Sequence, residues 1–304
     1  MTIWRRFVDY IKVWWSAFDW AALTELITWL ILGCVALYLL KKLIRYFVNR
    51  GREYGFQRIV GMEEIKKRLY DDVIFPFYHA KQYKKFNLSL PSGILFYGPP
   101  GCGKTFFVER LAEELNMNYM KVDHADLASP YIHETVSKIS KMFEAAEGAA
   151  PCLLFIDELD SIVQSRDDMG GDSIYKHEEV NEFLLHLENA SKNGVLVVGT
   201  TNHLEKIDRA IMRSGRFDLK IYIGPPDELA RESLFVSELK HIPCAKDIDV
   251  LALARLTEDY TSADIVSIVK VAAREAVANG LRFVDQTLLE DAIRNTPSSL
   301  EKDE

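Results

Sequence analysis

The most informative stretch of this sequence is Tyr97-Gly98-Pro99-Pro100-Gly101-Cys102-Gly103-Lys104-Thr105. It fits the pattern G-x-x-x-x-G-K-[ST], in which Gly98 and Gly103 let the backbone turn so that successive N–H groups point at a phosphate. Lys104 adds a cation that can reach the β- and γ-phosphates, and the Thr105 hydroxyl can bind Mg²⁺. The stretch therefore predicts a binding site for a nucleoside triphosphate, which includes the neighbouring Phe106.

The flanks of this stretch supply the context that such a loop requires. Residues 93–97 read as a short buried strand, and residues 105–115 read as a helix whose positive end faces the loop. Further apolar runs predict strands at 119–122, 152–156, 195–199 and 220–223, with helices at 135–147 and 178–188 between them. Alternating strands and helices predict an α/β fold with a parallel sheet covered on both faces. We expect this domain to span residues 49–224, with a helical approach at 62–86 interrupted by Pro76, and a helical lid domain at 225–304.

The N-terminal residues predict a membrane anchor. Between Ala21 and Leu40 the only ionisable residue is Glu25, and the apolar character continues to Val48. A membrane-spanning helix needs roughly 20 mostly apolar residues, so residues 21–48 are long enough, including a basic flank. Basic residues are denser after this segment than before it, which predicts a single-pass protein whose C-terminal side is cytosolic. A helix buried in a soluble core is the alternative. Residues 1–20 have apolar residues at helical spacing, which suits an amphipathic helix at a membrane surface or a separate contact surface.

The charge of the chain is unevenly distributed. The net charge is −8, yet residues 1–52 hold eight Lys and Arg against three acids, which leaves 29 bases and 42 acids in the remainder. Nucleic-acid binding depends on neutralising phosphates, so this acidic remainder makes nucleic acid a poor candidate partner. The four cysteines have no C-x-x-C spacing and are typical of reduced thiols.

Two acids follow the apolar run at 152–156. Asp157 and Glu158 fall at the carboxyl end of a predicted strand, where open α/β sheets place their ligands. Asp157 can hold Mg²⁺ together with Thr105, and Glu158 can orient and polarise an attacking water. An acid pair on the surface is the alternative reading.

Four motifs follow one another along the chain. They are Gly98-Pro99-Pro100-Gly101-Cys102-Gly103-Lys104-Thr105, Phe155-Ile156-Asp157-Glu158-Leu159-Asp160, Gly199-Thr200-Thr201-Asn202 and Arg213-Ser214-Gly215-Arg216-Phe217-Asp218. Their order and separations resemble those of the AAA ATPases, and the resemblance covers residues from about 58 to the C-terminus. The resemblance implies the AAA+ form of the P-loop NTPase fold, a three-layer parallel sheet with a small helical lid, and ATP with Mg²⁺ as cofactors.

The resemblance also implies roles for individual residues. Asn202 would sense the γ-phosphate, and Arg213 and Arg216 would be arginine fingers that reach the nucleotide of the next subunit. Fingers acting across subunits imply a closed ring, which we expect to be a homo-hexamer. Ordinary surface ion pairing is the alternative for the two arginines.

Two further segments resemble the parts of the family that contact adenine. Ile59-Val60-Gly61 resembles the apolar segment ahead of the first helix, although Arg58 replaces the usual acid. Ser262-Ala263-Asp264 resembles the Gly-Ala-Asp of the lid, with Ser262 in place of glycine. The resemblance therefore implies contacts from Ala263 and Asp264.

Tyr131-Ile132-His133 resembles the first pore loop of the family. The aromatic and the apolar residue are present, but histidine replaces the usual glycine. An aromatic side chain at a pore can grip an extended polypeptide without reading its sequence. We expect Tyr131 and Ile132 to contact protein substrates, against ordinary packing of a loop tyrosine.

Three functions follow from these observations. The first is a membrane-anchored AAA ATPase that extracts, unfolds or translocates protein substrates, including membrane proteins, through a hexameric pore. The second is a membrane-located ATPase that disassembles complexes or filaments, and the third is a nucleotide-gated scaffold without hydrolysis. The presence of Lys104, Asp157, Glu158 and Asn202 speaks against the third.

Cys102 lies inside the phosphate loop, next to Lys104 and a helix N-terminus. A positive field there would lower the pKa of the thiol and make it sensitive to oxidation. An inert buried thiol is the alternative.

Overall fold

The computed structural model describes residues 28–29, 32–33, 54–127, 134–163, 173–213 and 215–300. The chain divides into two compact units, residues 1–53 and 54–304. The predicted amphipathic segment at 1–20 and most of the predicted span at 21–48 lie outside the described residues. No helix in the described ranges combines the length and apolar character needed to cross a membrane.

A five-stranded sheet forms the centre of the second unit. Its strands are all parallel and lie in the order β2-β3-β4-β1-β5. They are β1 (Gly93–Tyr97), β2 (Asn118–Val122), β3 (Cys152–Ile156), β4 (Val195–Thr201) and β5 (Phe217–Tyr222). The sequence predicted every one of these strands, but β4 continues to Thr201 and β5 begins at Phe217, earlier than expected.

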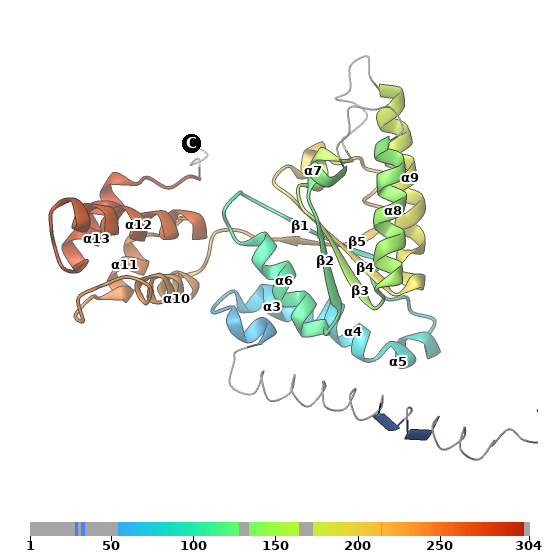
Figure 1. Cartoon of the computed structure of the whole chain (residues 1–304), viewed down its shortest axis with the longest axis horizontal. Helices are drawn as coiled ribbons and strands as arrows, with labels where there is room; N and C mark the ends of the chain where they lie inside the picture. The colour runs from blue at the N-terminus through green and yellow to red at the C-terminus, as the bar shows by residue number, and fades with distance from the viewer. Residues whose placement is uncertain are drawn as a thin grey trace, which may run out of the picture. The chain divides into compact units, whose positions relative to one another are not determined.

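The sheet is covered on both faces, as the continuous apolar strands predicted. Alternate residues of one strand enter different cores: Leu154 packs with the helices α8 and α9, whereas Leu153 and Phe155 pack with α3 and α6. Figure 1 shows the resulting three layers, with α8 and α9 on one side of the sheet and α3, α4 and α6 on the other. These helices are α3 (Glu63–Leu69), α4 (Phe75–Tyr78), α5 (Ala80–Lys85), α6 (Lys104–Leu115), α7 (His124–Leu127), α8 (Glu134–Gly148) and α9 (Ser173–Ala190), and short 3-10 helices include η1 (Gly55–Arg58) and η5 (Ser191–Asn193).

The helical segment that precedes the sheet was predicted to be interrupted at Pro76, and the structure shows otherwise. Pro76 lies in the first turn of α4, where its missing N–H costs little. A π-helical turn, η2 (Tyr70–Ile74), precedes it, and the Phe75 N–H bonds to the Tyr70 carbonyl five residues back. The interruption comes instead at His79, which separates α4 from α5.

The C-terminal part of this unit is helical, as the sequence predicted, and has its own core. Phe235, Ile265 and Leu289 are completely buried in that core. Aspartate or threonine side chains accept a backbone N–H at the start of each helix, a common way to satisfy the free donors there. The helices are α10 (Glu228–Leu239), α11 (Val250–Leu256), α12 (Ser262–Ala278) and α13 (Gln286–Asn295).

Candidate active site

A cavity of about 740 Å³ lies at the carboxyl ends of the strands, between the phosphate loop and the lid helix α12. The predicted side chains that line it include Lys104, Thr105, Asp157, Glu158 and Asn202. The first two begin the helix α6, and the other three directly follow β3 and β4, which are neighbours in the parallel sheet. The fold therefore brings together side chains that lie nearly a hundred residues apart in the sequence.

The phosphate loop has the backbone that its glycines predicted. Gly98 and Gly103 have φ values of 142° and 88°, a region of backbone conformation that residues with a Cβ atom rarely adopt. The Lys104 ammonium donates to the carbonyl oxygens of Gly98 at 2.8 Å and Pro99 at 2.7 Å. Its third bond, 2.7 Å long, goes to the Asn202 side-chain oxygen. The loop cation is thus joined directly to the residue predicted to sense the γ-phosphate.

The Lys104 side chain is buried, and this affects its titration. Burial lowers the pKa of the ammonium, because a charge loses solvation away from water. The nearby Asp157 and Asp160 carboxylates act in the opposite direction. A cation placed in such surroundings is well suited to binding an anionic phosphate.

Asp157 is held in position on both carboxylate oxygens. Its Oδ1 accepts a hydrogen bond of 2.6 Å from the Thr200 hydroxyl, and its Oδ2 lies 3.4 Å from the Lys121 ammonium. The Asp157 carboxylate and the Thr105 hydroxyl, which line the same cavity, are the hard oxygen donors that Mg²⁺ prefers. The residues present therefore fit a magnesium ion, which Asp157 and Thr105 would hold and which would supply positive charge beside the phosphates.

Glu158 has an unusual backbone conformation. Its φ of 51° and ψ of 52° lie in the left-handed region, which is uncommon for residues other than glycine. Strained conformations of this kind persist at sites where the surroundings impose them. The Glu158 N–H points to the Asp157 Oδ1 at 3.2 Å, and the exposed side chain lines the cavity. This position suits a base that orients a water beside the phosphates.

Thr200 is a residue that the sequence reasoning did not single out. It is 2% exposed, and its hydroxyl donates to Asp157 while lying 3.4 Å from the Glu158 N–H. It thus contacts both acids. We expect Thr200→Val to raise the Mg²⁺ concentration needed for half-maximal nucleotide binding about tenfold, because supporting partners of metal ligands typically contribute that much.

Binding of a fluorescent ATP analogue, titrated with Mg²⁺, measures this effect. Thr200→Ser keeps the hydroxyl and is the matched control, which should behave as wild type. Nucleotide binding without Mg²⁺ should not change in either variant. Equal Mg²⁺ dependence of Thr200→Val and wild type would show that the hydroxyl does not position Asp157.

A second, smaller cavity of about 280 Å³ lies beside the phosphate loop, and it has apolar walls. Ile59, Val60, Cys102 and Phe106 line it, together with residues of α10. Gly61 does not line it, but its φ of 71° brings the backbone close to Asp227, which accepts a bond from the Met62 N–H. The position of this cavity is compatible with the predicted adenine contacts of Ile59 and Val60.

The lid reaches the phosphate loop through Ala263. The Ala263 N–H donates to the Gly101 carbonyl at 3.1 Å, so Ser262 in place of glycine does not prevent a close approach of the backbones. Asp264 was expected to contact the nucleotide, but the structure shows it in a different role. Its carboxylate caps α12 by accepting bonds from Thr261 and Ser299, and it lines neither cavity.

Those hydrogen bonds decide the charge of Asp264. Burial alone would raise the pKa of this carboxyl, but the bonds from Thr261 and Ser299 outweigh it and lower the pKa. Asp264 therefore holds the start of the lid helix as a carboxylate. Its contact with a nucleotide stays a prediction.

The two predicted finger residues lie outside the cavity of their own subunit, and their surroundings differ. Arg216 donates to the Glu188 carboxylate at 2.7 Å and to the Ala210 carbonyl, so its own subunit holds it. The Arg213 side chain is exposed, and its guanidinium has no hydrogen bond or ion pair with any part of the chain that the structure describes. Of the two, Arg213 is the guanidinium that is free to act elsewhere.

The expectation that Cys102 is an activated thiol is wrong. The residue is 2% exposed, and burial raises the pKa of its thiol more than the nearby Lys104 ammonium lowers it. The alternative of an inert buried thiol fits these findings. The sequence correctly predicted that Lys104 lowers the pKa of the thiol, but it did not predict that the Cys102 side chain is buried.

Other site features also escaped the sequence reasoning or lie outside the described residues. Thr201 donates to Asp160 at 2.6 Å, and Lys270 of α12 lines the large cavity from the lid side. The sequence feature that could have identified Thr200 and Thr201 is their position directly before Asn202, at the end of a buried strand. Tyr131 and Ile132 of the predicted pore loop lie outside the described residues.

Comparison with protein-family models agrees with this geometry. Residues 94–225 match the ATPase family associated with various cellular activities (AAA), and residues 247–291 match the AAA+ lid domain. The first match covers nearly all of the sheet and the phosphate loop, and the second covers most of the helical core, including the α12 residues that line the cavity. The chain is therefore an AAA+ ATPase, with ATP as its expected nucleotide, and such ATPases typically assemble as hexamers.

Proposed function

We propose that this protein is a membrane-anchored, hexameric AAA ATPase that uses ATP hydrolysis to extract, unfold or translocate protein substrates. It would be a single-pass protein with its ATPase domain on the cytosolic side. Residues 21–48 would form the anchor, and membrane proteins would be among its substrates.

The observation that best supports a ring is the position of Arg213. Its exposed side chain has no partner in the described part of the chain and does not line its own phosphate cavity. An arginine with these properties can complete the site of a neighbouring copy, where it would neutralise charge on the transferring phosphoryl group. Contacts that pass from each subunit to the next close into a ring.

Extraction from a membrane tests the proposed activity. The full-length chain is reconstituted into liposomes with a tail-anchored protein, and the substrate remaining in the membrane is measured after ATP is added. Release that needs hydrolysable ATP supports extraction. Release of subunits from a soluble complex, without any loss of the membrane substrate, would favour a disassembling ATPase instead.

Tyr131 provides a residue-level prediction. We expect Tyr131→Ala to abolish substrate release while leaving basal ATPase within about twofold of wild type, because the residue is predicted to grip substrate by packing. Tyr131→Phe is the matched control, since it keeps the ring and should retain release. Loss of ATPase together with release in Tyr131→Ala would indicate a structural role.

A further inference from the structure

A basic and aromatic surface lies on α4, α5 and the segment that follows them. Its exposed apolar side chains include Tyr78 at 64%, Phe86 at 79% and Leu88 at 56%. The exposed Lys81, Lys84 and Lys85 lie among them. We call these six residues the α5 surface.

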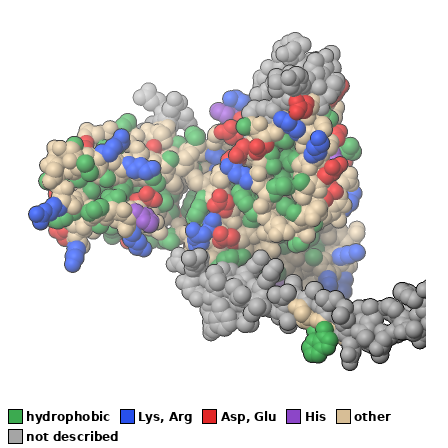
Figure 2. All heavy atoms as spheres, in the orientation of Figure 1, with side chains coloured by type: hydrophobic (Ala, Val, Ile, Leu, Met, Phe, Trp, Pro, Cys, Tyr) green, Lys and Arg blue, Asp and Glu red, His purple; other side chains and the backbone are tan. Residues whose placement is uncertain are grey.

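The charge of this surface contrasts with the acidic remainder of the chain. No Asp or Glu occurs between residues 73 and 108. The three lysines form no ion pair with any residue that the structure describes, whereas other lysines on the unit, such as Lys66 and Lys121, are paired with acids. Figure 2 shows basic side chains in blue on the surface in the region of α5. The α5 surface thus combines three lysines, unpaired among the described residues, with exposed aromatic and apolar side chains.

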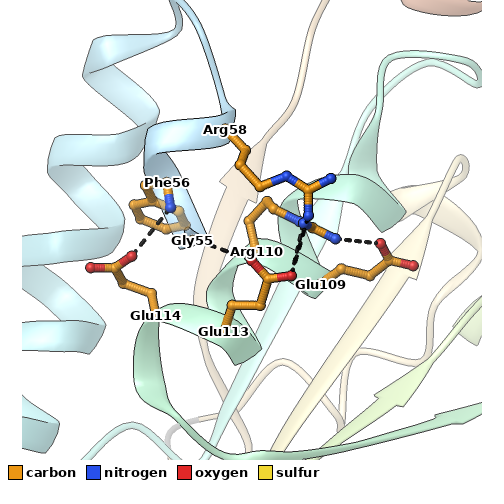
Figure 3. A network of polar contacts seen from close by, with 7 residues as sticks. All are labelled: Gly55, Phe56, Arg58, Glu109, Arg110, Glu113 and Glu114. Carbon is orange, nitrogen blue, oxygen red and sulfur yellow. Dashed lines mark hydrogen bonds and ion pairs between the residues drawn. The ribbon is translucent and has the colours of Figure 1, made fainter. Parts of the chain in front are cut away.

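The place where the chain enters this unit is fixed close to the same surface. The N–H groups of Gly55 and Phe56 bond to the carboxylates of Glu113 and Glu114 at 3.0 and 3.2 Å, and Figure 3 shows this network on α6. The Tyr78 hydroxyl donates to the backbone carbonyl of Glu114 at 2.8 Å. Tyr78 of the α5 surface and the entering chain therefore contact one and the same residue.

The network that holds the entry point is anchored in the protein interior. Arg110 is 7% exposed, and its guanidinium lies between Glu109 and Glu113, at 3.0 and 2.8 Å. Arg58, from the entering segment, reaches Glu113 at 3.5 Å. Several charged contacts on one helix thus position residues 55–58, and the entry point cannot move far from α4.

We propose that the α5 surface docks on the anionic headgroups of the bilayer that carries the anchor, an inference that rests on the single-pass arrangement proposed above. Residues 49–53 separate the predicted span from Tyr54, and five extended residues reach about 17 Å at most. A span that ends at residue 48 would therefore keep Tyr54 within about that distance of the membrane. Tyr78 contacts Glu114, the residue that also binds the Phe56 N–H.

The chemistry of the α5 surface suits this partner. Lysine ammonium groups are attracted to anionic lipids, and tyrosine and phenylalanine insert at the level of the headgroups. An apolar cavity of about 220 Å³, lined in part by Phe77, Tyr78 and Leu90, adds to the apolar character beside the patch. Docking would hold the ATPase unit in one orientation at the membrane.

The test uses the full chain in nanodiscs of phosphatidylcholine, with and without about 30% phosphatidylserine, a fraction that gives the surface a strong negative potential. A fluorophore is attached at Ser89→Cys, next to the patch, in a Cys34→Ser, Cys244→Ser background. Ala278→Cys, an exposed position on the lid, carries the control label. Quenching by lipids with a nitroxide on the headgroup reports proximity to the membrane.

We expect quenching at position 89 in the anionic discs and little at position 278. Replacing Lys81, Lys84 and Lys85 with Gln should shift the docking equilibrium about a hundredfold toward the undocked state, because each lysine contributes about fivefold. Basal ATPase of this triple variant in detergent should stay at the wild-type level, which shows that it folds.

Three other outcomes would each overturn the docking. A chain that does not insert into nanodiscs removes the anchor, and the docking with it. Insertion with equal quenching at position 89 in both lipids and in the triple variant leaves the anchor in place but excludes the docking. Burial of the label that depends on ring assembly in detergent would make the α5 surface a contact between subunits.

Discussion

Glu158→Gln is expected to bind ATP as tightly as wild type and to hydrolyse it about 10² to 10⁴ times more slowly, the usual contribution of a general base. Glutamine has the same size and can adopt the same left-handed backbone, so the cavity keeps its shape. It cannot accept a proton from the attacking water. The metal-binding carboxylate of Asp157 remains in place.

Steady-state hydrolysis and binding of a fluorescent ATP analogue separate the two effects. Glu258→Gln, on an exposed part of the lid, is the matched control and should hydrolyse at the wild-type rate. Glu158→Gln should also keep its ring assembled in ATP, because bound nucleotide is not turned over. Hydrolysis within a few-fold of wild type would remove Glu158 from the role of base.

The sheet could be read from the sequence because its strands are continuous apolar runs that end in turns or polar residues. Such runs identify strands that are buried on both faces, and residues 152–156 and 195–198 are examples. Element ends were less exact, since β4 continues through Thr200 and Thr201, which look polar but are buried. The π-helical turn at Tyr70–Ile74 was not predicted from the sequence.

The candidate site was predictable where side chains act directly on a ligand. Lys104, Thr105, Asp157, Glu158 and Asn202 line one cavity, and their motifs had identified them. Supporting contacts were not predictable, because the bond from Thr200 to Asp157 depends on the register of β3 beside β4. The burial of Cys102 and the bonds from Ser299 to Asp264 likewise depend on how distant segments pack.

Arg213→Ala is expected to lower the ATPase rate about 10³-fold or more, the range found for arginine fingers that act across subunits. The exposed Arg213 has no partner in the described residues that its loss would leave unpaired, so the fold should be unaffected. Arg255→Ala, an exposed arginine paired with Glu228 on the lid, is the matched control and should keep its activity. Arg216 is a different case, because Glu188 already holds it within its own subunit.

Mixing two inactive variants tests most directly whether the site is shared between subunits. Arg213→Ala subunits keep an intact Glu158, and Glu158→Gln subunits keep an intact Arg213. If Arg213 acts on the neighbouring site, random rings made at equal amounts should contain about a quarter complete sites, because each site draws on two adjacent subunits. The ATPase rate of such mixed rings, confirmed by co-purification of two different tags, should therefore recover to about a quarter of wild type. Mixed rings no more active than the two separate variants would contradict a shared site.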